Sequence, residues 1–514
     1  MRTRHLVQSS LLVILIFGIN KLTGFGKLLL MTSIFGTGPD ADAYAAANQL
    51  PELFLAMLTG GALAAALIPI YSAYLIKQET REAEELAHTV FTLTLVLVGG
   101  VCLIAAAAAP WLVRVVLVPN FSPEQQATTA GLMRIILFSS ALISIGSLIT
   151  SLLHAHQHFL APAWATVAID IGQVLGIVLF WQMWGIYSAA IGSVIGAILA
   201  IGVQLPALKQ RRIGLRLRLA LRLRGVRELG RLMWPRVITL GVFQAVDLVF
   251  IRLASQLPDG SISAYFYATL AMVAMPKSLF GTAISHVIFP TLAEQYNSGG
   301  NAHLRATVTQ GLRATWLLIL PAAFGLLALG QPAVAFLFQR GAFDEGSTQL
   351  VYALMAILSL RLIGDASQDI LSLIFYARHN TITPMWLNLG WMVINVGLSF
   401  ALIGPFGILG LAWAASLASL ALAVALFLLG RGVGEFLDEA LLRTTLWRLL
   451  PAGLGMVAAV TALQMLGLPT LLYLPIGIGG GGLVFVGIYV TLGGRELHEF
   501  VAAMRQDEIR RLIE

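Results

Sequence analysis

The sequence predicts an all-α polytopic membrane protein with about fourteen transmembrane helices, arranged as two six-helix repeats followed by two C-terminal helices. Three observations support this fold class. The chain is strongly apolar, its apolar residues fall into windows long enough to cross a bilayer, and two blocks of residues recur at a nearly constant spacing. We take these observations in order.

Of the 514 residues, 58% are hydrophobic and 11% are charged, and the mean hydropathy is +0.85. Soluble domains carry about 25% charged residues, so a bilayer is the expected solvent. A spanning helix needs about 20 apolar residues. We expect spans near residues 10–36, 43–73, 88–117, 127–155, 160–183, 186–208, 229–256, 263–290, 305–330, 348–377, 383–403, 405–430, 445–467 and 470–493.

The first window begins like a secretion signal, with a basic start and an apolar run in "MRTRHLVQSSLLVILIFGIN". No small-residue cleavage site follows and the apolar run continues, so we interpret it as the first span. Cys102 is the single cysteine. The chain therefore has no intrachain disulfide and no cysteine-based metal site.

The Lys and Arg residues behind the net charge of +7 are divided unevenly between the two sides of the membrane. The even-numbered connections and both tails, which lie on one side, carry most of them. The positive-inside rule then places both termini in the cytoplasm and requires an even number of spans. The most basic connection, "KQRRIGLRLRLALRLRGVRELGR", alternates leucine and arginine with period two. This pattern favours a segment lying on anionic headgroups over a nucleic-acid partner.

An internal repeat appears at a spacing of about 221 residues. The first block matches Ala43, Tyr44, Gly60, Ala62 and Pro69 with Ala264, Tyr265, Gly281, Ala283 and Pro290. The second matches Pro162, Trp164, Gly185 and Ile186 with Pro384, Trp386, Gly407 and Ile408.

A repeat of six spans gives two units in the same orientation, related by a pseudo-two-fold axis along the membrane normal. We expect an N-terminal lobe at 1–208, a basic interfacial linker at 209–228, a C-terminal lobe at 229–430, and two further helices with a tail at 431–514. Two facing bundles of this kind are typical of alternating-access transport.

Charges inside the membrane are costly and usually mark function. In the first span, "NKLTGFGKLLLMTSIFG" carries Lys21 and Lys27. On an ideal helix they lie about 120° apart. Gly24 and Gly26 lie between them, and glycine tolerates a bend that would bring both lysines into one cavity.

The tenth span carries a polar stripe, which must face protein or water. Arg361 and Asp365 either neutralise one another at i, i+4 or belong to the site. Asp369 has no partner on its own helix, so we expect it to pair with Lys21 or Lys27, or to bind a proton or sodium ion. The stripe comprises Arg361, Asp365, Gln368, Asp369 and Ser372. Asp170, Asp247 and Arg252 are single charges, each as consistent with an interhelical hydrogen bond as with a ligand role.

No enzyme signature is present. The segment "GIGGGGLVFVG" lacks the Lys-Ser/Thr ending of a phosphate-binding loop and falls within a span, where glycines serve helix packing. The histidines of "HAHQHF" lack a nearby carboxylate and are more consistent with a solvated loop than with a metal site. We expect no enzyme activity, metal or cofactor, and energy from a sodium or proton gradient or from the membrane potential.

Several segments resemble the MurJ (MviN) lipid II flippases of the multidrug, oligosaccharidyl-lipid and polysaccharide exporter superfamily. These are "GFGKLLLMTSIFGTGPDADAYAAANQLPELF", "GGALAAALIPIYSAY", "LLHAHQHFLAPAWA", "FLFQRGAFDEGST" and "FYARHNTITPMWLNL". The resemblance covers essentially the whole chain. It implies transfer of the undecaprenyl-pyrophosphate-linked peptidoglycan precursor from the inner to the outer leaflet of the bacterial cytoplasmic membrane. It also implies a cationic central cavity for the pyrophosphate and a groove near the last two helices for the lipid tail.

Lys21 and Lys27 fall where this family has two cavity arginines, and Asp42 matches a family aspartate. A lysine offers the pyrophosphate a point charge where arginine offers a two-pronged fork. With these residues we assign Arg361, Asp365 and Asp369 to substrate binding.

This chain departs from the family pattern at several charged positions. Leu55, Gly60, Thr269 and Leu270 stand where the family has charges, and Asp369 stands where it commonly has a lysine. The cavity is therefore less cationic than the family norm. Asp247 and Asn388 are candidates for a sodium site, although the residue four after Asn388 is Met392, which does not coordinate sodium.

The leading hypothesis is a monomeric flippase whose partners are a polyprenyl-pyrophosphate-linked glycan and membrane lipids. The alternative keeps the superfamily but changes the cargo to another lipid-linked oligosaccharide or to an amphiphilic cation exported by ion antiport, which Asp365 and Asp369 favour. A third hypothesis is a membrane scaffold without transport activity.

Overall fold

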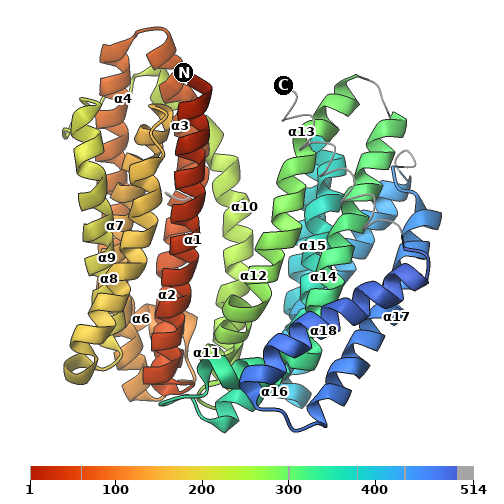
Figure 1. The fold of residues 1–514 in the computed structure, drawn as a ribbon. Helices are drawn as coiled ribbons and strands as arrows, with labels where there is room; N and C mark the ends of the chain where they lie inside the picture. Colours follow the sequence, from red (N-terminus) through yellow and green to blue (C-terminus); the bar gives the residue numbers. More distant parts are fainter. Residues whose placement is uncertain (1, 59–60, 299–300, 379, 433–435, 495–514) are drawn as a thin grey trace. The chain divides into compact units, whose positions relative to one another are not determined.

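The computed structural model describes residues 2–58, 61–298, 301–378, 380–432 and 436–494, and within these ranges the chain is helical without β-strands (Figure 1). The C-terminal tail that we expect in the cytoplasm, residues 495–514, lies outside them. The elements are α1 (Arg2–Phe35), α2 (Pro39–Leu58), α3 (Gly61–Ile76), α4 (Thr80–Leu93), η1 (Thr94–Val98), α5 (Gly99–Ala107), α6 (Ala109–Trp111), η2 (Leu112–Leu117), α7 (Pro123–Ala155), α8 (Leu160–Trp184), α9 (Tyr187–Gln210), α10 (Arg224–Ala254), α11 (Ser261–Tyr267), η3 (Ala268–Val273), α12 (Ala274–Pro276), η4 (Lys277–Thr282), α13 (Ala283–Asn297), α14 (Asn301–Phe338), α15 (Glu345–Ala377), α16 (Ile382–Gly432), α17 (Glu439–Gln464) and α18 (Thr470–Thr491), where η marks short π-helical segments.

Within the described ranges, 11 helices are long and apolar enough to cross a membrane. One of them, α16, contains two of the expected spans and has non-helical backbone at Gly407, where they meet. The expected second span, 43–73, corresponds to α2 and the shorter apolar helix α3, and α10 covers most of the expected span 229–256. The membrane-protein fold class is confirmed, and the count of fourteen stays a prediction.

The helices form two compact units. Unit 1 contains the chain up to Ser263 together with Arg340–Phe343, and unit 2 contains Ala264–Gln339 and the described residues from Asp344 onward. The expected boundaries at 208, 228 and 430 stay predictions.

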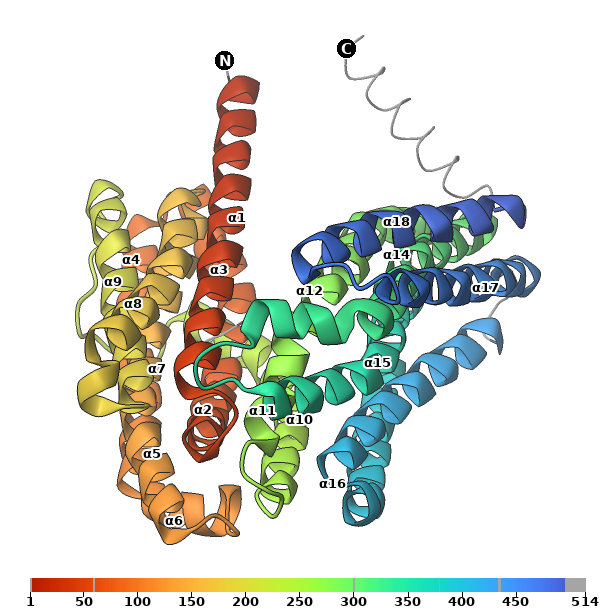
Figure 2. The ribbon, with the colours of Figure 1, turned by 60° about the horizontal axis from the view of Figure 1, so that its bottom comes forward.

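In unit 1, helix α8 packs against both α9 and α1, while α7 packs against α9 and α2 (Figures 1 and 2). A buried aliphatic core connects α3, α4, α7 and α9, with Leu67, Leu86, Leu148 and Leu152 fully enclosed. Burial of such side chains stabilises a fold by about 1.5 to 3 kcal/mol each when water is the alternative. The packing of α1 on α8 is the contact that positions the charged residues of this unit.

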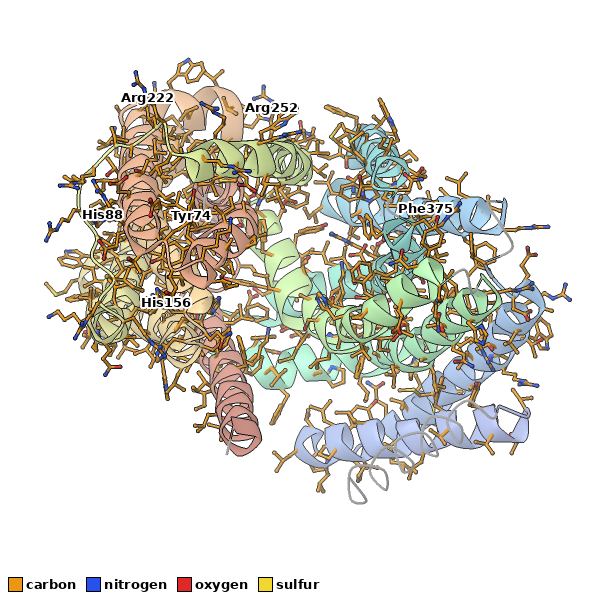
Figure 3. The ribbon with its side chains drawn as sticks, turned by 90° about the horizontal axis from the view of Figure 1, so that it is seen from above. Tyr74, His88, His156, Arg222, Arg252 and Phe375 are labelled. Carbon is orange, nitrogen blue, oxygen red and sulfur yellow. The ribbon has the colours of Figure 1, made fainter. Side chains whose placement is uncertain are left out.

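The basic linker between α9 and α10 is attached to unit 1 through its backbone. The N–H groups of Arg216, Arg218 and Ala220 donate to side chains on α4, and that of Gly225 donates to the Tyr74 hydroxyl. The acceptors on α4 are the Nδ1 atom of His88 and the hydroxyls of Thr92 and Thr89. Figure 3 shows Tyr74, His88 and Arg222 in this part of unit 1. The bonds come from alternate N–H groups, which is typical of an extended segment. Its arginines and Leu217, Leu219 and Leu221 are exposed, whereas Leu215 packs against the core.

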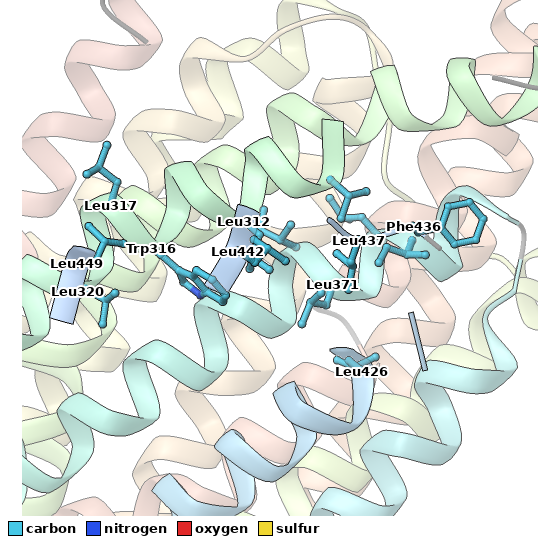
Figure 4. Packing of buried hydrophobic residues seen from close by; sticks show 14 of the residues in the cluster. Leu312, Trp316, Leu317, Leu320, Leu371, Leu426, Phe436, Leu437, Leu442 and Leu449 are labelled. Carbon is cyan, nitrogen blue, oxygen red and sulfur yellow. The ribbon is translucent and has the colours of Figure 1, made fainter. Parts of the chain in front are cut away.

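In unit 2, α14 packs against α15, α17 and α18, and α15 packs against α16. The core between these helices is built from leucines and aromatic residues (Figure 4). Within it the indole N–H of Trp316 donates to the hydroxyl of Ser367 over 2.8 Å. This bond satisfies the indole N–H, the single polar group of the buried Trp316 side chain.

The backbone repeats between the two units, as the sequence spacing predicts. Helices α7 and α15 both contain 33 residues and begin after a side-chain N-cap, Ser122 on α7 and Asp344 on α15. Gly185 and Gly407 adopt nearly the same conformation, with φ of 51° and 57° and ψ of −133° and −134°. Glycine alone adopts such a conformation without strain. The recurrence of these residues thus reflects a recurring helix break.

Candidate functional site

The lysines of the first span lie on the uninterrupted helix α1. The helix continues through Gly24 and Gly26, which both have helical backbone, so the glycines that would tolerate a bend do not interrupt it. Lys21 is exposed, and its ammonium makes no ion pair or hydrogen bond with any residue that the structure describes. Lys27, on a different side of the helix, is partly enclosed. The two lysines therefore have different surroundings.

Lys27 forms an ion pair with Asp170 of α8, with 2.8 Å between the Nζ and Oδ1 atoms. Lys27 thus has an acidic partner within its own unit, and the expected pairing of Asp369 with Lys21 or Lys27 stays a prediction. The other oxygen of Asp170, Oδ2, accepts from Asn20 Nδ2 over 3.1 Å. It also lies 3.4 Å from Thr23 Oγ1, whose single proton it shares with the carbonyl of Asn20 at 3.0 Å. Asp170 thus makes an interhelical contact, which was one of the two roles that the sequence left open for it.

Gly24 makes this arrangement possible. A Cβ atom at this position would lie 3.2 Å from Asp170 Oδ2, which is tighter than most contacts of this kind. Without a side chain there, α8 brings the carboxylate close to α1, next to Asn20, Thr23 and Lys27. Gly24 thus acts through close approach and not through bending.

Two further carboxylates of unit 1 belong to neighbouring helices. Glu52 on α2 interacts electrostatically with Asp247 on α10 and with Lys27, and both acidic side chains are exposed. The sequence analysis missed Glu52, although a glutamate in "NQLPELF" within an apolar window was a signal for it. With Asp170 counted, carboxylates outnumber lysines in this group.

Unit 2 contains a second charged cluster, centred on Asp365 of α15. Its Oδ2 atom lies 3.3 Å from Arg361 Nε and 3.3 Å from Lys277 Nζ, and its Oδ1 atom accepts from the hydroxyl of Ser419. The predicted i, i+4 pair is therefore present. Lys277 at the start of η4 was missed, although it is the single lysine of the expected eighth span. Two cations thus share one carboxylate.

Asp369 lies one turn further along α15. Its Oδ2 accepts from the hydroxyl of Thr282 over 3.3 Å. The neighbouring Gln368 donates weakly to Asn388 Oδ1, and Asn388 Nδ2 donates to the carbonyl of Pro384. The polar stripe therefore contacts polar groups of η4 and α16 within unit 2.

The candidate ion site stays a prediction. Asp247 belongs to unit 1 and Asn388 to unit 2. No group of three or more His, Cys, Asp or Glu side chains that could hold a metal is found in the described ranges. In the "HAHQHF" segment, the Nε2 atom of His156 lies 3.5 Å from the hydroxyl oxygen of Tyr71.

Asp42 has a role in the fold. It is 1% exposed, and its two oxygens accept the backbone N–H groups of Gly260 and Ser263 at 2.8 and 2.7 Å. These bonds fix the start of α11. Burial raises the pKa of the Asp42 carboxyl to about 6, although the bonds from Ser263 and Gly260 act in the opposite direction. Substrate binding by Asp42 stays a prediction, and its contacts support a structural function instead.

An apolar cavity of about 800 Å³ lies in unit 2 between α14, α15, α16 and α17. Its walls include Trp316, Leu420, Ala423 and Leu446, and the charged side chains that line it are Glu439 and Arg443 of the first turns of α17. Such a cavity can hold a hydrocarbon chain.

Comparison with known proteins identifies the fold and the family. The family model described as lipid II flippase MurJ matches residues 31–475. A probable lipid II flippase MurJ of Bdellovibrio bacteriovorus is 28% identical over 456 residues, which cover 88% of this chain and 85% of that protein.

Two solved structures share the fold. A lipid II flippase MurJ in an inward closed conformation matches with a TM-score of 0.79 and 20% identity, covering 96% of this chain and all of the other. An inward-facing multidrug resistance MATE transporter of the MOP superfamily matches with a TM-score of 0.68 and 15% identity, over 84% of this chain and 99% of the other.

Proposed function

Because the chain belongs to the lipid II flippase MurJ family, we propose that it moves lipid II from the inner to the outer leaflet of the cytoplasmic membrane by alternating access. The observation that carries the proposal is the family match over residues 31–475, together with Lys21, a cation exposed in the middle of an apolar helix. A charge at such a position is costly unless it faces water or a ligand.

In this proposal the pyrophosphate binds Lys21 and Lys27 of unit 1. A pyrophosphate diester carries two negative charges, so cations in a region of low dielectric attract it strongly. In unit 2, we also assign Arg361, Asp365 and Asp369 to substrate binding, together with Lys277, whose ammonium pairs with Asp365 and interacts electrostatically with Asp369. In this proposal Asp369 is also a proton or sodium acceptor that couples transport to an ion gradient.

We assign the polyprenyl tail to the apolar cavity beside α17. Burial of a hydrocarbon chain contributes roughly 25 cal/mol per Å² of apolar surface removed from water, but far less when the alternative is lipid. The cavity therefore serves to align the tail while the charged residues supply the headgroup affinity.

The proposal includes the orientation and state of the protein. It is a monomeric transporter with no nucleic-acid partner and no enzyme activity, and both termini lie in the cytoplasm. The excess of Lys and Arg in the even-numbered connections supports this orientation. Accessibility of terminal tags in right-side-out vesicles tests it, and labelling of either tag from outside would contradict it.

A genetic experiment tests the main proposal. Cells depleted of their own lipid II flippase should grow when they express this chain, and should not grow when they express Lys21→Met at the same membrane level. Lys77→Met is the matched control, because Lys77 is an exposed lysine directly after α3. Failure of the well-expressed wild-type chain to rescue growth would contradict the proposal.

A second function, export of an amphiphilic cation by ion antiport, is favoured by one observation. In the charged group around Lys27, the three carboxylates of Glu52, Asp170 and Asp247 outnumber the one lysine, which suits a cationic cargo. Purified protein that binds an amphiphilic cation such as ethidium but not lipid II would support this second function.

A further inference from the structure

Asp170 is held by more donors than one ion pair requires. It is 8% exposed and accepts from Asn20, Thr23 and Lys27 of α1. These positions follow one another at spacings of three and four residues, so they lie on one face of the helix. The carboxylate therefore rests in a binding site that α1 provides for it.

The two side chains of the ion pair differ in exposure and in flexibility. The Lys27 side chain is 32% exposed and the Asp170 side chain 11%. Lysine has a flexible four-carbon stem with a compact charge, while aspartate is short and here lies against Gly24. If Lys27 turns toward a ligand, Asn20 and Thr23 still donate to Asp170 and stabilise its charge. Lys27 can thus leave the pair, whereas Asp170 stays in place.

From this geometry we propose that Asp170 is an internal counterion that competes with lipid headgroups for Lys27 and so sets the selectivity of the site. The proposal rests on the proposed function. Glu52 also attracts Lys27 electrostatically, but only Asp170 pairs with it directly, so a ligand engages Lys27 only if it attracts the ammonium more strongly than the Asp170 carboxylate does. The pyrophosphate diester of lipid II, a dianion, meets this requirement, and the phosphodiester monoanion of a bulk phospholipid does not.

This competition prevents bulk phospholipids from occupying Lys27. Bulk phospholipids greatly exceed any lipid-linked precursor in number, so a site made only of unpaired lysines would fill with them. Specificity is a difference of affinities. A dianion displaces Asp170 and gains the contact with Lys27, whereas a monoanion does not displace it and loses that contact, so the difference in affinity between the two ligands grows. Lys21 has no such competitor within the described ranges, so it attracts both kinds of headgroup.

The test compares Asp170→Asn with wild type in nanodiscs. The asparagine side-chain oxygen can still accept from Asn20 and Thr23, so the helix contact is kept while the charge is removed. Asp40→Asn is the matched control, because it makes the same chemical change at an exposed position. Lipid II binding is measured for each full-length variant in discs of phosphatidylcholine alone and in discs that also contain phosphatidylglycerol.

In phosphatidylcholine discs we expect Asp170→Asn to bind lipid II about tenfold more tightly than wild type. Phosphatidylglycerol should remove most of this gain, while it weakens wild type and Asp40→Asn little. In a Lys27→Met background the effect of Asp170→Asn should vanish. Unchanged or weaker binding by Asp170→Asn, or a gain that persists without Lys27, overturns the proposal.

Two further readouts keep the outcome clear. If Asp170→Asn does not fold, Asn20→Ala is used instead. This variant removes one donor to Asp170, so the carboxylate should attract Lys27 more strongly. The proposal therefore predicts that Asn20→Ala binds lipid II more weakly than wild type. Equal or tighter binding by folded Asn20→Ala overturns it. If wild type itself binds no lipid II, the proposed function fails as well; if wild type binds and Asp170→Asn does not gain, only this inference fails.

Discussion

Replacing Lys27 by methionine should destabilise the protein, whereas the same change at Lys21 should not. Lys27→Met removes the ammonium that lies 2.8 Å from Asp170 and leaves a mostly buried carboxylate with two neutral donors. Removing one partner of a fully buried pair costs about 3 to 5 kcal/mol, and exposed pairs contribute about 0.2 to 1 kcal/mol. The Lys27 side chain is about one-third exposed, so we expect a loss between these limits, about 1 to 2 kcal/mol.

Lys21→Met removes a cation that has no partner in the described part of the chain. Its effect on stability should be within about 0.5 kcal/mol, as is usual for substitutions that break no interaction.

The assay is the free energy of unfolding in mixed micelles titrated with sodium dodecyl sulfate, followed by far-ultraviolet circular dichroism. The double variant Lys27→Met, Asp170→Asn should regain most of the loss, because the uncompensated charge is gone. Equal losses for Lys21→Met and Lys27→Met, or no recovery in the double variant, would refute the assignment of Asp170 as the partner of Lys27.

The remaining predictions concern the scaffold and the cavity. Because the pKa of Asp42 is raised from 3.8 to about 6, folding favours its protonated form. The free energy of unfolding of wild type, relative to that of Asp42→Asn, should therefore fall by about 3 kcal/mol as the pH rises from about 4 to about 6, and should stay level above that. Gly185→Ala and Gly407→Ala should each reduce the free energy of unfolding by about 1 to 3 kcal/mol, and by similar amounts, because both positions need the same positive φ. Ala423→Phe should fill part of the cavity beside α17 and weaken lipid II binding several-fold, roughly 1 kcal/mol, as measured by titration in nanodiscs.

Matched variants separate these effects from general damage. Asp40→Asn changes an exposed carboxyl and should show no such trend with pH, and the same trend in both variants would contradict the account of Asp42. Leu429→Phe enlarges an exposed residue of α16 outside the cavity wall. If it weakens lipid II binding as much as Ala423→Phe does, the assignment of the cavity fails. A large difference between the two glycine variants would argue against equivalent helix breaks.

The repeat could be predicted from sequence because the recurring residues include glycines that the backbone conformation requires. Gly185 and Gly407 recur where each unit turns sharply between two helices, and few other residues adopt that conformation. Long apolar windows likewise identify spanning helices without knowledge of their neighbours. Local requirements of this kind leave a signal in the sequence.

The charge pairing could not be predicted in the same way. Lys27 and Asp170 lie 143 positions apart, and they meet because α1 and α8 pack closely at Gly24. From sequence alone, Gly24 was explained by its tolerance of a bend, and only the packing shows that it permits the close approach of Asp170. The charges do not follow the repeat, since neither Asp170 nor Asp365 has an acidic counterpart at the repeat spacing. Pairing therefore depends on helix packing, which periodicity does not encode.

The most direct test of the central claim is transfer of lipid II across the bilayer of proteoliposomes. The chain is reconstituted with lipid II, and the fraction that reaches the opposite leaflet is measured by its accessibility to an added enzyme that modifies the headgroup. The account predicts transfer by wild type and Lys77→Met, and a rate at least about tenfold lower for Lys21→Met, the loss expected when about 1.4 kcal/mol of headgroup binding is removed. Equal transfer by Lys21→Met and wild type, or no transfer by folded wild type, would contradict it.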